Sequence, residues 1–388
     1  MTQFGIDKLR FYTPGFSLDH ELLATKRGID PKKFVLGLGQ SQMSILPPDE
    51  DIVSMAANAA QPLLGDSERE AIRLVLFATE SGVDQSKAAG LWVHHLLGLN
   101  PCCRVVELKQ ACYSATCTLQ LAISYLHTHP LEKVLLIASD EARYGLNTPG
   151  EPTQGSGAIA IILSASPRLF AIEPHQGIYA EHIMDFFRPN YLREAIVDGK
   201  FSTKMYLQIL TFCWNDYVKN SCLQFKDHSR FCYHIPFSKM AEKAHERLCR
   251  IAEAPLDLSI LEPSLVYSRL TGNVYAAALY VGLSSLLEND EEDLAGCRVG
   301  LFSYGSGCVG EFFSGIVQQG YREALYSYDH KELLLTRKKL SYDEYVSFFS
   351  HQLPEDGSDY LTPTISKTSF RLVGIKNHER IYGRNNIT

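Results

Sequence analysis

The chain has 388 residues, 45% of them hydrophobic and 21% charged, which is enough for one large core or two fused ones. Its formal net charge of -7 argues against non-specific binding to nucleic acid or to anionic membranes. No stretch has the pattern of a secretory signal or the length of a membrane span. The ten cysteines have no zinc-type spacing, so we expect packed thiols, a cytoplasmic location and no metal.

The first half of the chain alternates strand and helix patterns. Continuous apolar runs predict buried strands, and apolar residues at helical spacing predict helices between them. In chain order these are a strand at 73–79, a helix at 86–97, a strand at 103–109, a helix at 117–127, a strand at 133–139 and its hairpin partner at 158–163. This alternation indicates an α/β fold in which helices cover a sheet.

The second half repeats the order of strand, glycine loop and strand. Its predicted elements are a helix at 240–251, a possible strand at 264–268, an amphipathic helix at 274–287, and strands at 298–304 and 309–317. The weak duplication predicts a boundary near Pro167, with halves 1–166 and 167–388. We expect a helical insertion at about 191–225 over the site, and a C-terminal extension that ends in two short strands.

Cys112 lies where the predicted strand at 103–109 gives way to a helix. A helix N-terminus favours negative charge, so the pKa of this thiol should fall, and the thiolate is the form that attacks a thioester. The alternative is a small buried residue, since free cysteine packs like a hydrophobe.

Glu80 directly follows the predicted strand at 73–79. The carboxyl ends of strands are where α/β proteins gather their ligands, and desolvation there would raise the carboxyl pKa toward the working pH of a general acid or base. A loop acid that caps the helix beginning at Ser86 is the competing interpretation.

His234 and two lysines follow in the second half. His234 ends an apolar segment and could polarise a carbonyl, although most histidines in such places are hydrogen-bonded core residues. Lys239 and Lys243 share one helix face and could hold phosphates, or could simply be solvated.

Two glycine loops, at 155–157 and 305–307, could offer backbone amides to an oxyanion, although tight turns explain most such loops. There is no glycine fingerprint of dinucleotide or ATP binding, so neither chemistry has support.

Taken together, these segments closely resemble the 3-hydroxy-3-methylglutaryl-CoA (HMG-CoA) synthases, especially the short bacterial type, in the thiolase superfamily. The motifs that carry the resemblance span nearly the whole chain: 35–41 (VLGLGQS), 51–60, 78–81 (ATES), 110–116 (QACYSAT), 142–147, 150–158, 234–240 (HIPFSKM), 272–275 (GNVY) and 302–307 (FSYGSG).

The resemblance implies an α/β fold of thiolase type, with five αβαβα layers in two duplicated halves, and a homodimer. It implies condensation of acetyl-CoA with acetoacetyl-CoA and water to HMG-CoA and CoA, a step of the mevalonate route, with no cofactor beyond the CoA thioesters themselves. In these roles Cys112 matches the nucleophile that takes the acetyl group, Glu80 the acid/base that removes its methyl proton, and His234 the residue that holds the acetoacetyl carbonyl.

The same resemblance extends to substrate-binding positions. These are Asp30 near the mouth, Tyr144, Thr153, Ser202, Asn273 and Ser306 along the substrate, and Lys239 and Lys243 at the CoA moiety. Three departures from the family pattern, at 276–278 (Ala-Ala-Ala), Phe187 and Cys308, leave the three central residues intact, so we expect altered affinity and not a lost reaction.

Other functions stay open at this point. A β-branching synthase would perform the same chemistry on carrier-protein thioesters in polyketide synthesis. A non-catalytic acyl-CoA-binding relative would not need the intact set of Glu80, Cys112 and His234. A cysteine hydrolase would use Cys112 and His234 without Glu80.

Overall fold

The largest element of the structure, a computed structural model that describes residues 2–385, is a mixed sheet of nine strands. Their order across the sheet is β11 (Arg230–Tyr233), β12 (Arg298–Gly305), β13 (Val309–Val317), β8 (Phe170–Ala180), β1 (Phe4–Tyr12), β7 (Gly155–Ala165), β6 (Lys133–Ala142), β4 (Ile72–Ala78) and β5 (Arg104–Leu108). β4 is parallel to both β5 and β6, and β11 is parallel to β12. β1 and β8 pair only at Gly5–Ala171 and Ile6–Phe170, so the sheet consists of two halves joined by a short seam.

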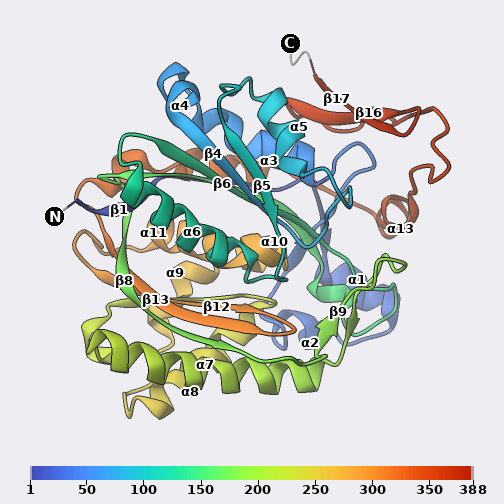
Figure 1. Ribbon diagram of the computed structural model, residues 1–388. Helices are drawn as coiled ribbons and strands as arrows, with labels where there is room; N and C mark the ends of the chain where they lie inside the picture. The colour runs from blue at the N-terminus through green and yellow to red at the C-terminus, as the bar shows by residue number, and fades with distance from the viewer. Residues whose placement is uncertain (1, 386–388) are drawn as a thin grey trace.

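Six helices form three layers around the two halves of the sheet. α3 (Ile52–Ala60) and α5 (Ala89–Leu96) cover the outer face of the first half, α7 (Gly199–Ser221) and α8 (Ser238–Ile251) cover the outer face of the second, and α6 (Ser114–Thr128) and α11 (Ala278–Asn289) lie between the halves. Figure 1 shows this stacking from α3 and α5 at the top to α7 and α8 at the bottom.

The strand sequences explain the layers. Successive side chains of a strand point to opposite faces, so a strand that is apolar throughout can bury both of its faces. In β4, Val75 and Phe77 pack in the cluster that contains α3 and α5, whereas Leu74 and Leu76 pack in the cluster that contains α6 and α11. This alternation confirms the predicted five-layered α/β arrangement.

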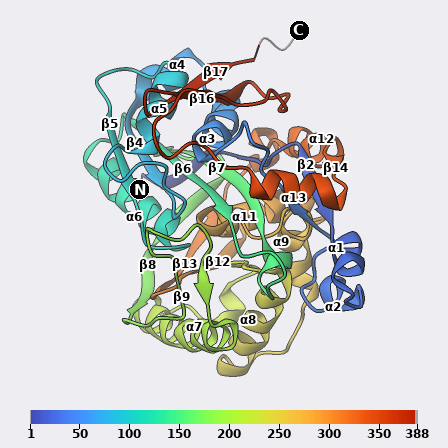
Figure 2. The ribbon, with the colours of Figure 1, turned by 90° about the vertical axis from the view of Figure 1, so that its right-hand side faces the viewer.

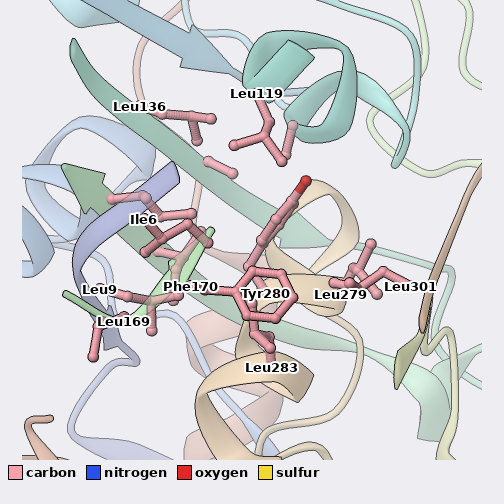
Figure 3. Packing of buried hydrophobic residues seen from close by; sticks show 14 of the residues in the cluster. Ile6, Leu9, Leu119, Leu136, Leu169, Phe170, Leu279, Tyr280, Leu283 and Leu301 are labelled. Carbon is pink, nitrogen blue, oxygen red and sulfur yellow. The ribbon is translucent and has the colours of Figure 1, made fainter. Parts of the chain in front are cut away.

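The central layer holds the largest core of the molecule. Leu119 of α6, Leu136 of β6, Tyr280 of α11 and Leu301 of β12 all lie in it and are fully buried. Figure 3 shows these side chains converging from both halves of the sheet. The two halves are therefore held together mainly by apolar packing on α6 and α11.

Smaller elements surround this framework. Three small sheets are formed by β14 (Lys338–Lys339), β2 (Phe16–Asp19) and β3 (Gln42–Ser44), by β10 (Ile196–Val197) and β9 (Phe186–Phe187), and by β15 (Tyr360–Leu361), β16 (Phe370–Lys376) and β17 (Glu379–Arg384). The remaining α-helices are α1 (His20–Arg27), α2 (Lys32–Val35), α4 (Asp66–Ala71), α9 (Glu262–Leu265), α10 (Ser268–Thr271), α12 (Ser327–Leu335) and α13 (Tyr342–Ser350). The short 3-10 helices are η1 (Gln61–Leu63), η2 (Glu151–Thr153), η3 (Phe225–Asp227), η4 (Ser259–Leu261), η5 (Tyr275–Ala277) and η6 (Tyr321–Ala324). Figure 2 shows β16 and β17 above α3. Within residues 2–385, no helix combines the length and the hydropathy that crossing a membrane requires.

Most predicted elements are confirmed, and two are wrong. The segment 264–268, expected as a strand, lies across the helical turns α9 and α10, where Pro263 occupies the first helical turn. The segment 274–287 is not amphipathic: from Ala278 to Glu288 every residue of α11 is buried, because the helix lies between two sheet faces.

Two predictions concern the division of the chain. Residue 167 lies between β7 and β8, and the domain boundary at 166/167 stays a prediction. In the region of the expected insertion at 191–225, the main element is the single helix α7, which packs on β8 and β13 with Met205, Ile209 and Cys213 buried.

The central layer gives the first testable prediction. Replacing the buried Leu119 by alanine should lower the free energy of unfolding by about 2 to 5 kcal/mol, because it leaves a cavity where both halves of the sheet meet. Leu121→Ala on the same helix is the control, since Leu121 is 49% exposed and should change stability by no more than about 0.5 kcal/mol. Urea denaturation of both variants measures the difference, and equal losses would contradict the layer assignment.

Candidate active site

The structure brings Cys112 and Glu80 into direct contact. The Cys112 thiol donates a hydrogen bond to Oε1 of Glu80 with an Sγ–O distance of 3.0 Å. Glu80 follows β4, and Cys112 lies between β5 and α6. β4 and β5 are neighbouring parallel strands. The carboxyl ends of parallel neighbours meet at one edge of a sheet, so this edge places the two side chains together. α6 begins at Ser114, so Cys112 lies just before the helix that contains Cys117.

The backbone around Cys112 is unusual. Ala111 has a φ of 44°, a left-handed conformation that residues other than glycine seldom adopt. Such a conformation persists only where surrounding contacts hold it, and it turns the chain sharply between β5 and α6. The half-buried Cys112 follows immediately after this turn.

The prediction that the pKa of Cys112 falls is wrong for this structure. Burial and the adjacent Glu80 carboxyl raise the pKa of Cys112 well above its ordinary value. Burial and the Asp140 carboxyl raise the pKa of Glu80 to about 8. Desolvation and the nearby carboxyls therefore outweigh the helix N-terminus, so the thiol keeps its proton, and the adjacent carboxyl can accept that proton once it is ionised.

Asp140, which the sequence interpretation missed, fixes the segment that carries Glu80. It is fully buried at the end of β6, and its Oδ1 accepts hydrogen bonds from the backbone N–H of Glu80 at 2.9 Å, from that of Ser81 at 3.0 Å and from the hydroxyl of Thr79 at 2.8 Å. Its Oδ2 accepts the N–H of Ala276 at 3.0 Å, which ties the second half to the same point. An acidic residue that continues an apolar strand was the signal that could have revealed it.

Aromatic side chains line the space beside the sulfur. Tyr144, Tyr275 and Phe186 form a small cluster in which Cys112 also packs. The rings of Phe186 and Tyr275 lie 5.8 Å apart between centroids, and the Tyr144 ring lies 6.3 Å from that of Phe186. The guanidinium of Arg188, next to β9, donates to the backbone oxygen of Glu80. The β9 segment thus covers Cys112, although the sequence singled out only Tyr144 from this group.

The glycine loop after β12 touches the nucleophile turn. A Cβ on Gly305 would lie only 2.6 Å from the backbone nitrogen of Tyr113, so this position requires glycine. The side-chain amide of Gln110 donates to the backbone oxygen of Ser306 at 3.3 Å. In the described part of the chain, no group accepts a hydrogen bond from the backbone N–H of Cys112 or of Ser306, so both donors are available.

His234 is buried at the end of β11. Its backbone N–H donates to Phe302 of the adjacent strand β12 at 2.8 Å, and its backbone oxygen accepts the Tyr206 hydroxyl at 2.8 Å. Burial lowers the pKa of His234 to about 3, so the ring is neutral. Neither nitrogen of the His234 ring has a hydrogen-bond partner among residues 2–385. Since β11 and β12 are parallel, His234 lies at the same edge of the sheet as the Gly305 loop.

Asn273 and Thr153 come together beside this edge. The backbone N–H of Asn273 donates to the backbone oxygen of Thr153 at 3.1 Å, and its side-chain oxygen accepts the N–H of Tyr275 at 2.9 Å. Gly155 has no room for a side chain, because a Cβ there would lie 2.5 Å from the Asn273 oxygen. Tyr275 has a φ of 45°, the second left-handed residue in contact with the site.

A buried carboxyl links Ser202 to the glycine loop that contains Ser306. Asp185 accepts the Ser202 hydroxyl at 2.9 Å, the Tyr304 hydroxyl at 2.8 Å and the backbone N–H of Gly307 at 2.9 Å. It therefore joins the start of α7 to the glycine loop. The sequence analysis did not single out Asp185. From this segment it named only Phe187, as a departure from the family pattern.

Three predicted residues lie away from the nucleophile. Asp30 is exposed and accepts the backbone N–H of Lys32 at the start of α2. Lys239 pairs with Glu242, and Lys243 is exposed above the Phe237 ring. The backbone N–H of Lys239 donates to Leu38, so α8 and the segment after α2 form one surface. The structure does not bring these side chains into contact with Cys112.

A cavity of about 280 Å³ lies beside Ser81, and Cys112 is not among the residues that line it.

Among the described residues, no group of three or more His, Cys, Asp or Glu side chains is placed to hold a metal. Of the departures from the family pattern, Ala276 donates its backbone N–H to Asp140 and packs with Ala277 and Ala278 in the central core, and Cys308 is buried in the cluster that contains α7.

Comparisons with known proteins agree with this geometry. Residues 1–167 match the family model for the N terminal of hydroxymethylglutaryl-coenzyme A synthase, and residues 171–253 and 253–370 match the model for its C terminal. The chain is 43% identical over 357 residues to the hydroxymethylglutaryl-CoA synthase of Enterococcus faecalis, covering 91% of this chain and 93% of that one. It is 33% identical over 374 residues to the polyketide biosynthesis 3-hydroxy-3-methylglutaryl-ACP synthase PksG of Bacillus subtilis, covering 90% and 88%.

A solved structure gives the same answer. The crystal structure of an HMG-CoA synthase complexed with CoA superimposes with a TM-score of 0.94 at 39% identity, covering 99% of this chain and 100% of the other. The likeness includes the thiolase-like fold and extends over both halves of the sheet. The chain therefore belongs to the hydroxymethylglutaryl-CoA synthase family.

Proposed function

We propose that the chain condenses acetyl-CoA with acetoacetyl-CoA and water to give HMG-CoA and CoA, through an acetyl-cysteine intermediate. The observation that carries this proposal is the contact of 3.0 Å between the Cys112 sulfur and the Glu80 carboxyl, in a chain of this family. One side chain supplies a nucleophile, and the other is close enough to move both protons that the reaction requires.

In the first step, Glu80 accepts the thiol proton while the Cys112 sulfur attacks the acetyl carbonyl of acetyl-CoA. The carbonyl oxygen becomes negative, and the free backbone N–H groups of Cys112 and Ser306 are the donors that would stabilise it. Collapse of this intermediate breaks the carbon–sulfur bond to CoA, whose thiolate takes up the proton held by Glu80. Acetyl-Cys112 and CoA result.

In the second step, Glu80 removes a proton from the methyl group of acetyl-Cys112. The resulting enolate carbon forms a bond to the ketone carbon of acetoacetyl-CoA. Because desolvation keeps His234 neutral, its ring can donate an N–H hydrogen bond to that ketone oxygen without carrying a charge of its own. Protonation of the new alkoxide and hydrolysis of the enzyme thioester then release HMG-CoA and the free thiol.

The expected contacts of the other predicted residues with the substrates follow from where each residue lies in the site. Tyr144, Thr153, Ser202, Asn273 and Ser306 would line the acyl and pantetheine portions, since they surround the nucleophile or the loops that touch it. Lys239 and Lys243 would meet the CoA phosphates, and Asp30 would lie near the entrance. Lys239, Lys243 and Asp30 lie on the outer surface, away from Cys112, as the length of a CoA molecule bound at the thiol would require.

The chain would act as a homodimer in the cytoplasm. β5 is the last strand of the large sheet, so one of its edges has no strand partner among the described residues, and Val106 on it is 48% exposed. An unprotected edge strand invites pairing with another chain, and a second copy would extend the sheet across a twofold axis. All ten cysteines are free thiols, which supports a reducing compartment.

The roles of the two central residues can be separated. Cys112→Ala should form no covalent acetyl adduct with acetyl-CoA, whereas Cys117→Ala, which changes another half-buried cysteine nearby, should acetylate normally. Glu80→Ala should acetylate slowly but lose condensation by about 1,000-fold or more, because nothing removes the methyl proton. Intact-protein mass spectrometry and a coupled assay measure the two steps. Acetylation of Cys112→Ala, or normal condensation by Glu80→Ala, would refute the assignment.

The raised pKa of Glu80 predicts the pH dependence of acetylation. Only the ionised carboxyl can accept the thiol proton, and burial together with Asp140 raises the pKa to about 8. The value of kcat/KM for acetyl-CoA should therefore rise with pH up to about 8 and level off above it. A rate that is constant from pH 6 to 9 would show that Glu80 is already ionised at neutral pH.

A second candidate is the β-branching reaction on carrier-protein thioesters, which the relative PksG supports. The greater identity to the Enterococcus enzyme favours free CoA substrates. We expect kcat/KM for acetyl-CoA to exceed that for an acetylated carrier protein by at least about tenfold. Steady-state assays with both donors decide between them, and the opposite preference would assign the chain to polyketide synthesis.

A further inference from the structure

Glu311 is a buried carboxyl that the reaction described above does not use. It lies on β13, is fully buried, and points with Phe313 toward the central helix layer. Its Oε2 accepts the Tyr113 hydroxyl at 2.7 Å and its Oε1 accepts the side-chain amide of Gln120 at 2.7 Å. In the described part of the chain these are its only side-chain partners, and neither is a cation.

Such a group is costly to bury. A carboxyl without a positive partner loses its hydration and regains only two hydrogen bonds, and burial accordingly raises the pKa of Glu311 to about 7. An apolar residue would fill the same space between β13 and α6 more favourably. The presence of Glu311 at the core of the central layer therefore calls for a reason other than stability.

The partner of Glu311 suggests that reason. Tyr113 directly follows Cys112, and its backbone is pressed against Gly305, on the strand that pairs with β13. The turn that carries Cys112 is thus attached to the β12–β13 hairpin twice: at the Gly305 and Ser306 loop, and through the Tyr113 hydroxyl to Glu311. These two attachments fix the nucleophile turn relative to the glycine loop.

The same two segments carry the free amides of Cys112 and Ser306. We propose that Glu311 is a positioning residue: through the Tyr113 hydroxyl, it holds the N–H of Cys112 at the spacing from the N–H of Ser306 that a thioester oxyanion requires. This inference rests on the proposed acetyl transfer. It assigns the effect to the hydrogen bond and not to the charge of Glu311.

Three variants test the proposal. Glu311→Leu removes both acceptors, Tyr113→Phe removes only the hydroxyl, and Glu311→Gln keeps a carbonyl oxygen that can accept from Tyr113. The first two should slow single-turnover acetylation by about 10- to 100-fold with little change in KM for acetyl-CoA, because a small misplacement of the donors affects the transition state more than binding. Glu311→Gln should stay within about threefold of the unmodified protein.

A spectroscopic readout separates positioning from general damage. The infrared carbonyl band of the acetyl-enzyme, identified with ¹³C-labelled acetyl-CoA, reports the hydrogen bonds to the thioester oxygen. In Glu311→Leu and Tyr113→Phe this band should move toward the position of a free thioester. The double variant should be no slower than the slower single variant, because both changes break one connection.

Glu288 supplies a matched control. It is also a buried glutamate that accepts a tyrosine hydroxyl, from Tyr267, but it lies on α11 and also bonds to His330 of α12. Glu288→Gln should lower the melting temperature without changing the acetylation rate or the carbonyl band.

An unchanged rate and band in both Glu311→Leu and Tyr113→Phe, or equal losses in Glu311→Gln and Glu311→Leu, would overturn the proposal. The proposed function fails separately, if the unmodified protein forms no acetyl adduct. Since Tyr113→Phe removes a single oxygen atom, it keeps the test decisive even where Glu311→Leu does not fold.

Discussion

The contact between the Cys112 thiol and the Glu80 carboxyl is the interaction on which the rest of the site depends. Both groups are desolvated, which raises both pKa values; the Glu80 carboxyl raises the pKa of Cys112 further, and the Asp140 carboxyl raises that of Glu80. At neutral pH most molecules therefore hold a proton on each of the two groups. In the proposed reaction, the sulfur becomes nucleophilic when the ionised carboxyl takes the thiol proton across the 3.0 Å between them. The same carboxyl would then be free of its sulfur partner and close to the acetyl group that it would deprotonate.

The fold maintains this contact through several independent attachments. Asp140 binds the backbone on both sides of Glu80 and also holds Ala276 of the second half. The glycine loop after β12 supports the turn at Cys112 from the opposite side. Apolar packing on α6 and α11 keeps the two halves of the sheet in register. The strained backbone at Ala111 and Tyr275 persists because all of these contacts surround it.

Much of this arrangement could be predicted from the sequence, and the exceptions have physical causes. Apolar strands alternating with helices predicted the layers, and the ordered motifs predicted Glu80, Cys112 and His234. Patterns of single residues cannot report which face a neighbouring sheet covers, so the fully buried α11 was taken as amphipathic. Likewise, the helix end at Cys112 suggested a lowered pKa, whereas burial and the carboxyls of Glu80 and Asp140, which raise it, depend on contacts distant in sequence. Asp140, Asp185 and Glu311 were missed for the same reason: each bonds to segments far along the chain.

The most direct test of the central claim is the ionisation of Glu80 itself. Infrared difference spectra between the unmodified protein and Glu80→Gln, recorded from pH 5 to 10, isolate the bands of this one carboxyl. A protonated carboxyl band that gives way to a carboxylate band with a midpoint near pH 8 is the predicted result. A carboxylate band already complete at pH 6 would contradict a desolvated Glu80 carboxyl that keeps its own proton at neutral pH beside the Cys112 thiol.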